Sequence, residues 1–147
     1  MAILLDFNPT VIAAVNAGHN EFGEDLNESI IRNLVLNMIL SYRKQFGQKY
    51  GDLIICCDTG NAWRREIFPY YKHSRKKTRE ESPLNWPLIF SSLATIQQEL
   101  RDYMPFNVIA LPRCEADDII AVLSRYIVDH EPIEQGIDFD TQDVLIL

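Results

Sequence analysis

Four short apolar runs alternate with longer amphipathic stretches, and this alternation limits the fold more than any other feature of the chain. The runs lie at residues 2–5, 53–57, 106–111 and 144–147. Between them, residues 27–47 and 85–103 repeat apolar side chains with a period of about 3.6, which is typical of helices. Strands and helices that alternate in this way form a mostly parallel sheet with helices on both faces. We therefore expect one α/β domain over residues 1–147.

Local signals set the expected ends of these elements. Asn27 is a favourable helix N-cap, and Gly47 is typical of the position where a helix stops. Residues 8–10 are expected to start a turn or a short helix, and residues 18–25 to form a polar loop. The basic residues 63–79 are expected to form an irregular segment. Residues 74–83 show no apolar stripe and should be mobile without ligand.

Acidic residues stand where the apolar runs end. Asp6 closes the first run and Asp58 follows the second, and the helix expected after the third opens with Glu115, Asp117 and Asp118. In open α/β sheets, ligands bind beyond the carboxyl ends of the strands. A carboxylate cluster there is typical of a site for Mg²⁺ or Mn²⁺. The alternative is that acids in a first turn only complement the helix dipole, which leaves Asp6 and Asp58 unexplained.

Basic residues are concentrated in one segment of an acidic chain. The formal net charge is −7, yet half of the 14 Lys and Arg residues lie between positions 64 and 79. Aromatic residues are interleaved with these cations, a composition that stacks bases and neutralises phosphates. We predict that this segment binds nucleic acid; the alternative is a solvated surface loop. The candidate residues are Arg64, Arg65, Tyr71, Lys72, Arg75, Lys76, Lys77 and Arg79.

Other residue types argue against several classes of protein. The 3 cysteines lack CxxC spacing, so neither a disulfide framework nor a zinc site is expected. His19, His73 and His130 share no metal-ligand spacing. The N-terminus does not resemble a signal peptide, and no apolar stretch reaches transmembrane length. We expect a cytoplasmic protein that does not bind membranes.

An ordered set of motifs resembles a known family. The motifs are Leu-Leu-Asp-Phe, Cys-Asp-x-x-x-x-Trp-Arg-Arg, Tyr-Tyr-Lys-x-x-Arg-x-Lys-x-Arg-Glu-Glu-Ser, Tyr-Met-Pro and Glu-Ala-Asp-Asp. Together they are similar to bacteriophage RNase H enzymes of the T-even type, members of the flap endonuclease and 5′-nuclease superfamily. The resemblance implies a PIN-like nuclease domain that removes RNA primers and 5′ flaps during DNA replication. It also implies two Mg²⁺ or Mn²⁺ ions, DNA or RNA–DNA duplexes with a 5′ single strand as substrates, and replication proteins as further partners.

The resemblance also implies roles for individual residues. Lys72 and Arg75 match a basic pair that contacts the scissile phosphate at the foot of a helical arch. Residues 73–83 match the arch, through or under which the 5′ single strand passes. Asp118 matches an acid that binds metal directly or through water. The metal-site acids matched by position are Asp6, Asp58, Glu115 and Asp117.

One departure from the family pattern concerns the end of the chain. Family members carry an Asp-x-Asp pair after the next strand, followed by a region that grips the duplex. Asp138 and Asp140 have this spacing but precede the run at 144–147, so we interpret them as part of a polar connection. We therefore expect a domain truncated before these features, with little or no nuclease activity on its own. We also expect either a separate C-terminal polypeptide that completes the fold or a tendency to self-associate.

Two other functions compete with a nuclease. A degenerate nuclease-like domain would bind nucleic acid or a replication protein without cutting. The acids oppose this alternative, because clustered carboxylates without a cation repel one another. A nucleotide-binding domain of the Rossmann type is disfavoured, because no glycine-rich loop follows the first run.

Overall fold

The computed structural model describes residues 1–130 and 144–147. Among the described residues, no helix is both long enough and apolar enough to cross a membrane. The elements in chain order are β1 (Ala2–Asp6), α1 (Phe7–Phe22), the short 3₁₀ helix η1 (Gly23–Asp25), α2 (Glu28–Tyr50), β2 (Leu53–Cys56), α3 (Arg64–Ile67), α4 (Ser74–Glu80), α5 (Trp86–Tyr103), β3 (Asn107–Ile109), α6 (Ala116–His130) and β4 (Val144–Ile146).

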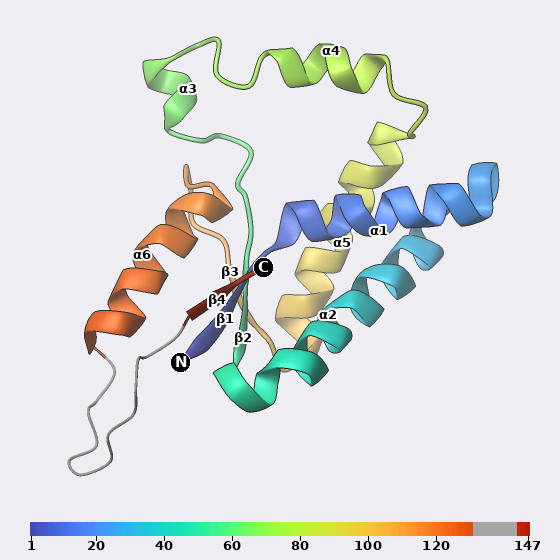
Figure 1. Cartoon of the computed structure of the whole chain (residues 1–147). Coiled ribbons are helices and arrows are strands. Elements are labelled where there is room, and N and C mark those ends of the chain that lie inside the picture. Colours follow the sequence, from blue (N-terminus) through green and yellow to red (C-terminus); the bar gives the residue numbers. More distant parts are fainter. Residues whose placement is uncertain (131–143) are drawn as a thin grey trace.

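The described strands form one parallel sheet in the order β3-β2-β1-β4 (Figure 1). In the register, Asp6 at the end of β1 lies opposite Cys56 of β2, and Cys56 lies opposite Ile109 of β3. The carboxyl ends of these strands therefore meet at one edge of the sheet. This arrangement brings together acids that are far apart in the sequence.

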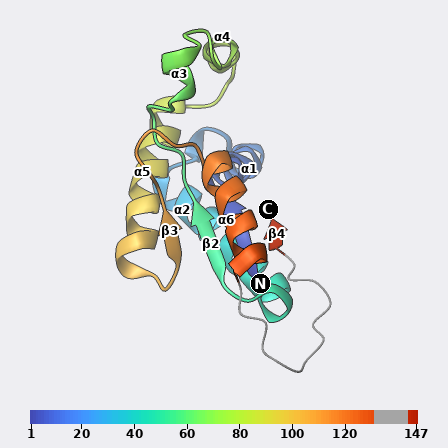
Figure 2. The ribbon, with the colours of Figure 1, turned by 90° about the vertical axis from the view of Figure 1, so that its left-hand side faces the viewer.

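Helices cover both faces of the sheet, which confirms the predicted fold class. Helices α1, α2 and α5 share a core with one face, and α6 packs on the other (Figures 1 and 2). Consecutive side chains of a strand point to opposite faces. Accordingly, Cys57 belongs to the core under α1, α2 and α5, and Cys56 to the core under α6.

The predicted loop at residues 18–25 is wrong. Helix α1 starts directly after β1 and runs to Phe22, and η1 follows it without a gap. Gly18 looks like a loop residue in the sequence but is buried where α1 meets its neighbours, since a Cβ there would lie 2.8 Å from Leu26 and from Leu34. The small residue permits close packing of the helix, which the local sequence does not reveal.

The end of α2 also differs from the prediction. The helix passes Gly47 and ends at Tyr50, because Gly51 has the left-handed backbone angle, φ 82°, that ends many helices. The Gly51 N–H donates to the Gly47 carbonyl at 2.9 Å. Tyr50, in the part of the helix beyond Gly47, packs against the core, so the extra turn buries apolar surface.

The basic segment is more regular than expected. It contains the short helices α3 and α4, which lie beyond the carboxyl ends of the strands (Figures 1 and 2). Neither helix has a fully buried residue. This explains the missing apolar stripe, because a helix that faces solvent on most sides needs none.

Candidate nuclease site at the carboxyl edge of the sheet

The predicted acids come from three places along the same edge. Asp6 ends β1 and caps α1, where its side chain accepts the Asn8 N–H at 3.3 Å. Asp58 lies just past β2, and Asp117 and Asp118 lie in the first turn of α6. The fold therefore gathers acids from β1, β2 and α6 around one edge.

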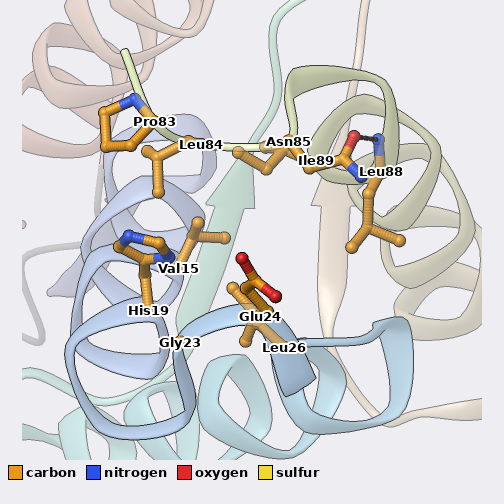
Figure 3. A pocket seen from close by; sticks show the side chains of 10 residues that line it. All are labelled: Val15, His19, Gly23, Glu24, Leu26, Pro83, Leu84, Asn85, Leu88 and Ile89. Atoms are coloured by element: carbon orange, nitrogen blue, oxygen red, sulfur yellow. Dashed lines mark hydrogen bonds between the residues drawn. The ribbon is translucent and has the colours of Figure 1, made fainter.

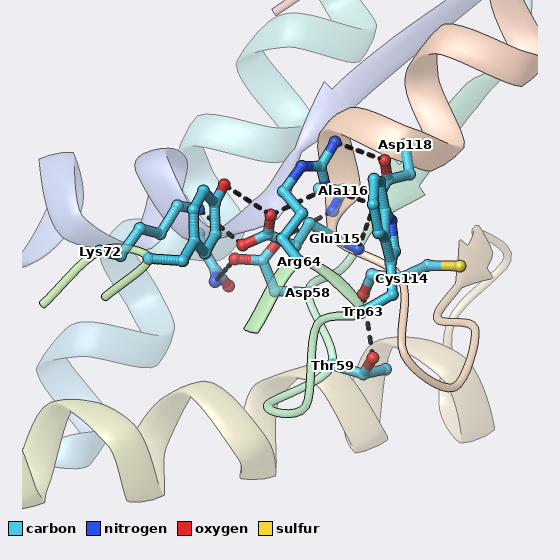
Figure 4. Close-up of polar contacts among 11 residues, drawn as sticks. Asp58, Thr59, Trp63, Arg64, Lys72, Cys114, Glu115, Ala116 and Asp118 are labelled. Atoms are coloured by element: carbon cyan, nitrogen blue, oxygen red, sulfur yellow. Dashed lines mark hydrogen bonds and ion pairs between the residues drawn. The ribbon is translucent and has the colours of Figure 1, made fainter. Parts of the chain in front are cut away.

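Asp58 joins three elements through its carboxylate. One oxygen accepts the backbone N–H of Ala116 at the start of α6 at 2.7 Å, and the other accepts the Asn8 side-chain amide at 2.7 Å (Figure 4). The first bond satisfies an N–H that the helix itself leaves unpaired. Asp58 is thus held in place by α1 and α6.

The pKa of Asp6 is raised by its surroundings. Burial, followed by the negative charges of Asp58 and Asp117, raises the pKa of Asp6 to about 6. Like charges that are close together disfavour ionisation, and a cation placed among them reverses that effect. Asp6 is therefore the acid of this edge whose ionisation is most disfavoured by burial and by its acidic neighbours.

Glu115 is directed toward the basic segment instead. Its carboxylate is buried and accepts from Lys72 Nζ at 2.6 Å, Tyr71 Oη at 2.8 Å and Arg64 Nη1 at 3.0 Å (Figure 4). Burial alone would raise the pKa of Glu115, but the hydrogen bonds from Lys72 and Tyr71 outweigh it and lower that pKa. Glu115 therefore remains ionised while it is enclosed by donors.

Asp118 is held mainly by Arg64. The guanidinium donates to both carboxylate oxygens at 2.7 and 2.8 Å, a bidentate geometry that makes a strong ion pair. This pair, more than any other contact, lowers the pKa of Asp118 to about 2. Asp118 also receives the Trp63 indole N–H at 3.3 Å and the Glu115 backbone N–H at 3.0 Å. Arg64, predicted to bind nucleic acid, thus binds two acids of the site.

Two strained residues flank this network. Lys72 has φ 56° and Arg113 has φ 66°, values that are uncommon for residues other than glycine. Strained backbone of this kind persists where surrounding contacts hold it, and it often marks functional sites. At Lys72 the strained turn places the ammonium group on Glu115.

A cavity of about 690 Å³ opens in front of the acids. Asp58 and Glu115 line it together with four cations of the basic segment, Arg65, Lys72, Arg75 and Arg79. Acids and cations thus share the wall of one cavity, and Lys72 lies directly against Glu115. The cations of this wall could neutralise the oxygens of a phosphodiester, whereas its carboxylates would repel them unless a cation lay between.

Lys76 and Lys77 lie outside this cavity. Both are on the exposed surface of α4 and make only long ion pairs one turn along the helix, Lys76 with Glu80 at 3.9 Å and Lys77 with Glu81 at 3.8 Å. Exposed pairs of this kind contribute little to stability. The two lysines are therefore available to a polyanion.

The acids do not yet form a complete metal centre. In residues 1–130 and 144–147, no three His, Cys, Asp or Glu side chains are placed to hold a metal ion together. Glu115 and Asp118 face Lys72 and Arg64, while Asp6, Asp58 and Asp117 interact mainly through their charges. Asp138 and Asp140 lie outside the described residues.

The family assignment follows from sequence comparison. Residues 13–143 match the family of the 5′-3′ exonuclease, N-terminal resolvase-like domain. The chain belongs to this family. It is also similar to ribonuclease H of Enterobacteria phage T4, at 36% identity over 125 residues that cover 83% of the chain. The chain spans 41% of the length of that relative.

The exonuclease family match includes most of the candidate site. Asp58, Glu115 and the whole basic segment lie within the matched residues, whereas Asp6 precedes them. The structure connects Asp6 to the rest, because its pKa responds to Asp58 and Asp117. The family assignment and the geometry therefore point to the same edge of the sheet.

Two residues of this exonuclease-family site escaped the sequence analysis. Asn8 orients Asp58, and the Thr59 hydroxyl donates to the carbonyls of Leu111 and Cys114, both at 2.9 Å, which anchors the loop before α6. Both follow a strand-end aspartate by one or two positions. Their position just after an aspartate is the only feature of the sequence that could have selected them. It is not specific, because short polar residues are common in any turn.

A second cavity of the domain, about 280 Å³, lies away from the acids (Figure 3). Its wall combines polar and apolar surface from α1, from η1 and from the start of α5, and His19 and Glu24 are its titratable residues. No residue predicted for the functional site lines it.

Proposed function

We propose that this chain is the N-terminal part of a metal-dependent 5′–3′ nuclease that removes RNA primers and 5′ flaps during DNA replication. Its substrates would be DNA and RNA–DNA duplexes with a 5′ single strand. The relative in phage T4 is more than twice as long, so we further propose that a C-terminal part completes the enzyme.

One observation supports the proposal above all others. Asp58 and Glu115 line the same cavity of about 690 Å³ as Lys72 and Arg75, and Lys72 lies directly against Glu115. A nuclease that uses metal ions needs oxygen ligands on one side of the phosphate and fixed cations on another. A generic anion site would have no use for Asp6, whose pKa is raised to about 6 by burial and by neighbouring acids.

The carboxylate oxygens at this edge are ligands of the type that a hard divalent cation prefers, although no three described side chains are placed to hold one together. In the proposed enzyme, Asp6, Asp58 and Asp117 would each supply a ligand to Mg²⁺ or Mn²⁺, and Glu115 and Asp118 would contribute directly or through water. When bound, two such ions would supply an activated water and stabilise the leaving 3′ oxygen. No nucleophilic side chain is required for this chemistry.

The chain's own residues would bind and orient the phosphate. Lys72 and Arg75 line the cavity and would neutralise charge that develops on the phosphate oxygens. Lys72 is bound to Glu115, so an incoming phosphate would compete for the ammonium group. Asn8 would keep Asp58 oriented throughout, since it donates to the oxygen that Ala116 does not use.

The test is a cleavage assay on a 5′-flap DNA and on an RNA–DNA hybrid with Mg²⁺ or Mn²⁺. The purified chain is assayed with and without a polypeptide that supplies the C-terminal part. We expect strong cleavage only with both metal and the second polypeptide, and loss of cleavage in Asp117→Asn. The control is Asp25→Asn, an exposed acid in η1 away from the site. Cleavage that survives Asp117→Asn or a chelator would contradict the proposal.

A second candidate function has one observation in its favour. Arg64 and Lys72 already neutralise Asp118 and Glu115, as they would in a domain that binds nucleic acid or a replication protein without cutting. In that case the chain binds the same substrates with unchanged affinity in Asp117→Asn, and no metal or added polypeptide produces cleavage.

A further inference from the structure

An aromatic pair lines the cavity in front of the acids and has no part in the chemistry proposed above. Trp86 and Phe90 stand one turn apart at the start of α5, and both face the cavity that Asp58 and Lys72 line. Their ring centroids are 5.8 Å apart, with 37° between the planes. The phosphate site and the aromatic pair thus open into the same space.

Core packing explains Trp86 only in part and Phe90 not at all. Trp86 packs against the core at its edge, and its indole N–H is buried without a hydrogen-bond partner among the described residues. Phe90 is 49% exposed, while Ile89 and Ile96 on the opposite side of α5 are buried. Phe90 and Trp86 thus offer two adjacent rings to the cavity, and the exposed ring of Phe90 leaves room for a flat ligand.

The faces of these rings already receive a planar cation. The Arg79 guanidinium lies 5.5 Å from the Phe90 centroid and 5.9 Å from that of Trp86. Arg79 comes from α4 and the rings from α5, so the contact spans the two ends of the loop between these helices (Figure 1). A flat π system of similar shape can therefore stack in the same place.

We propose that Trp86 and Phe90 form a stacking site for one nucleobase of a single-stranded nucleic acid. The base would lie on the aromatic rings while its neighbouring phosphates contact Arg75 and Arg79. The choice of a nucleic acid as the ligand rests on the proposed function, whereas the stacking surface itself is argued from the structure. The charge of the cavity supports that class, because an uncharged apolar ligand would gain nothing from four cations.

The stacking site would fix the position of the strand relative to the acids. Base stacking is tolerant of sequence because every base has a π face. A base held at α5 would fix the strand on the side of the cavity opposite α6. The distance along the strand from that base to the acids would then determine which phosphate is presented for cleavage.

The experiment measures binding without divalent metal, so it does not depend on catalysis. The 147-residue chain is titrated against a fluorescent single-stranded oligonucleotide of about 12 nucleotides. Phe90→Leu keeps an apolar side chain and removes the ring, and Phe90→Tyr keeps the ring. Tyr103→Leu is the matched control, since Tyr103 is an 82% exposed aromatic at the far end of the same helix.

We expect Phe90→Leu to weaken binding about 5- to 100-fold, and Phe90→Tyr and Tyr103→Leu to have little effect. The salt dependence of binding in Phe90→Leu should match that of the wild type, because no charge is removed. An abasic residue at one position of the oligonucleotide should weaken wild-type binding by a similar factor and have no further effect on Phe90→Leu.

Three outcomes would overturn the stacking site: equal losses in Phe90→Leu and Tyr103→Leu, an abasic penalty that is the same in wild type and Phe90→Leu, or no binding of the oligonucleotide at all. None of these decides whether the completed protein cuts flaps. Conversely, stacking that depends on Phe90 in a protein that never cleaves would support this site and contradict the nuclease.

Discussion

At the scale of single residues, the acids of the site lie in two different electrostatic environments. Arg64 and Lys72 hold Asp118 and Glu115, and these contacts lower the pKa of both acids. Asp6 has the opposite environment and a pKa raised to about 6. The acids of one edge therefore differ in environment: Glu115 and Asp118 are paired with cations, whereas burial and neighbouring acids outweigh the effect of Lys72 on the pKa of Asp6.

The first prediction concerns Asp6→Asn in the presence of a chelator. Asn keeps the capping bond to the Asn8 N–H and removes a partly buried charge. The free energy of unfolding at pH 7 should rise by about 1 kcal/mol, a value reduced from the full pKa shift because solvent screens a half-buried group. Urea unfolding of Asp6→Asn, with Asp25→Asn as control, checks this.

The same residue sets a pH dependence. Because the folded-state pKa of Asp6 is about 6 and its ordinary value is 3.8, the folded state binds a proton more tightly. Its contribution to stability is therefore full below pH 4 and is lost as the pH rises through 6. Without metal, the stability advantage of Asp6→Asn should grow between pH 4.5 and 7. An advantage that shrinks over this range would show that desolvation of Asp6 is not the cause.

The second prediction separates two kinds of lysine. In the completed enzyme, Lys72→Ala should lower kcat about 100-fold or more with little loss of substrate affinity, because it removes a charge used in the transition state. Changing Lys76 and Lys77 together to Ala should mainly weaken binding and reduce its salt slope by about 1 to 2. Lys44→Ala, an exposed lysine of α2, serves as the control. Equal losses of rate and affinity in both variants would indicate a generic electrostatic patch.

At the scale of elements, the ends of helices decide which residues reach the site. Asp6 ends β1 and at the same time caps α1, and Asp58 caps the start of α6. Each acid therefore has a structural role that uses part of its hydrogen-bonding capacity. A substitution in either position changes the helix start as well as the charge, which is why Asn is the appropriate replacement.

The third prediction tests where α2 ends. Gly47 lies inside the helix with ordinary backbone angles, so Gly47→Ala should stabilise the fold by up to about 1 kcal/mol. Gly51 has φ 82°, so Gly51→Ala should destabilise it by about 1 kcal/mol. Thermal unfolding of the pair is a sharp test because the signs are opposite. The reverse pattern would place the helix end at Gly47.

At the scale of the whole molecule, the sheet edge and the basic segment behave as one unit. Helices α3 and α4 lie beyond the strand ends (Figure 2). Arg64 of α3 and the residues Tyr71 and Lys72 of the turn between the two helices contact the acids. Metal or phosphate at the edge would therefore affect the basic segment as well as the sheet.

The fourth prediction concerns the stability of the whole fold. Mg²⁺ or Mn²⁺ that binds only the folded state should raise the free energy of unfolding by about 2.7 kcal/mol at one hundred times its dissociation constant. The melting temperature of the wild type and of Asp25→Asn should rise with metal, and that of Asp117→Asn should rise far less. Equal shifts in all three proteins would indicate nonspecific binding.

The sequence by itself determined the sheet, its direction and the acids at its edge. Apolar runs bounded by acids are local patterns, and parallel strands can only meet with their carboxyl ends together. For the same reason Asp6, Asp58 and Asp117 could be selected before any coordinates. The residue pattern also predicts that the basic segment binds a polyanion, since charge density is a property of composition.

Only the tertiary structure decided which charges meet. Glu115 binds Lys72, 43 positions away, and Asp118 binds Arg64, 54 positions away. Contacts of that range depend on how α3 folds back over α6 and on a strained turn at Lys72, φ 56°, that no local pattern predicts. The aromatic pair on α5 is a similar case. The apolar periodicity of a helix shows which face packs on the core, but not whether residues outside that face meet solvent or a cavity.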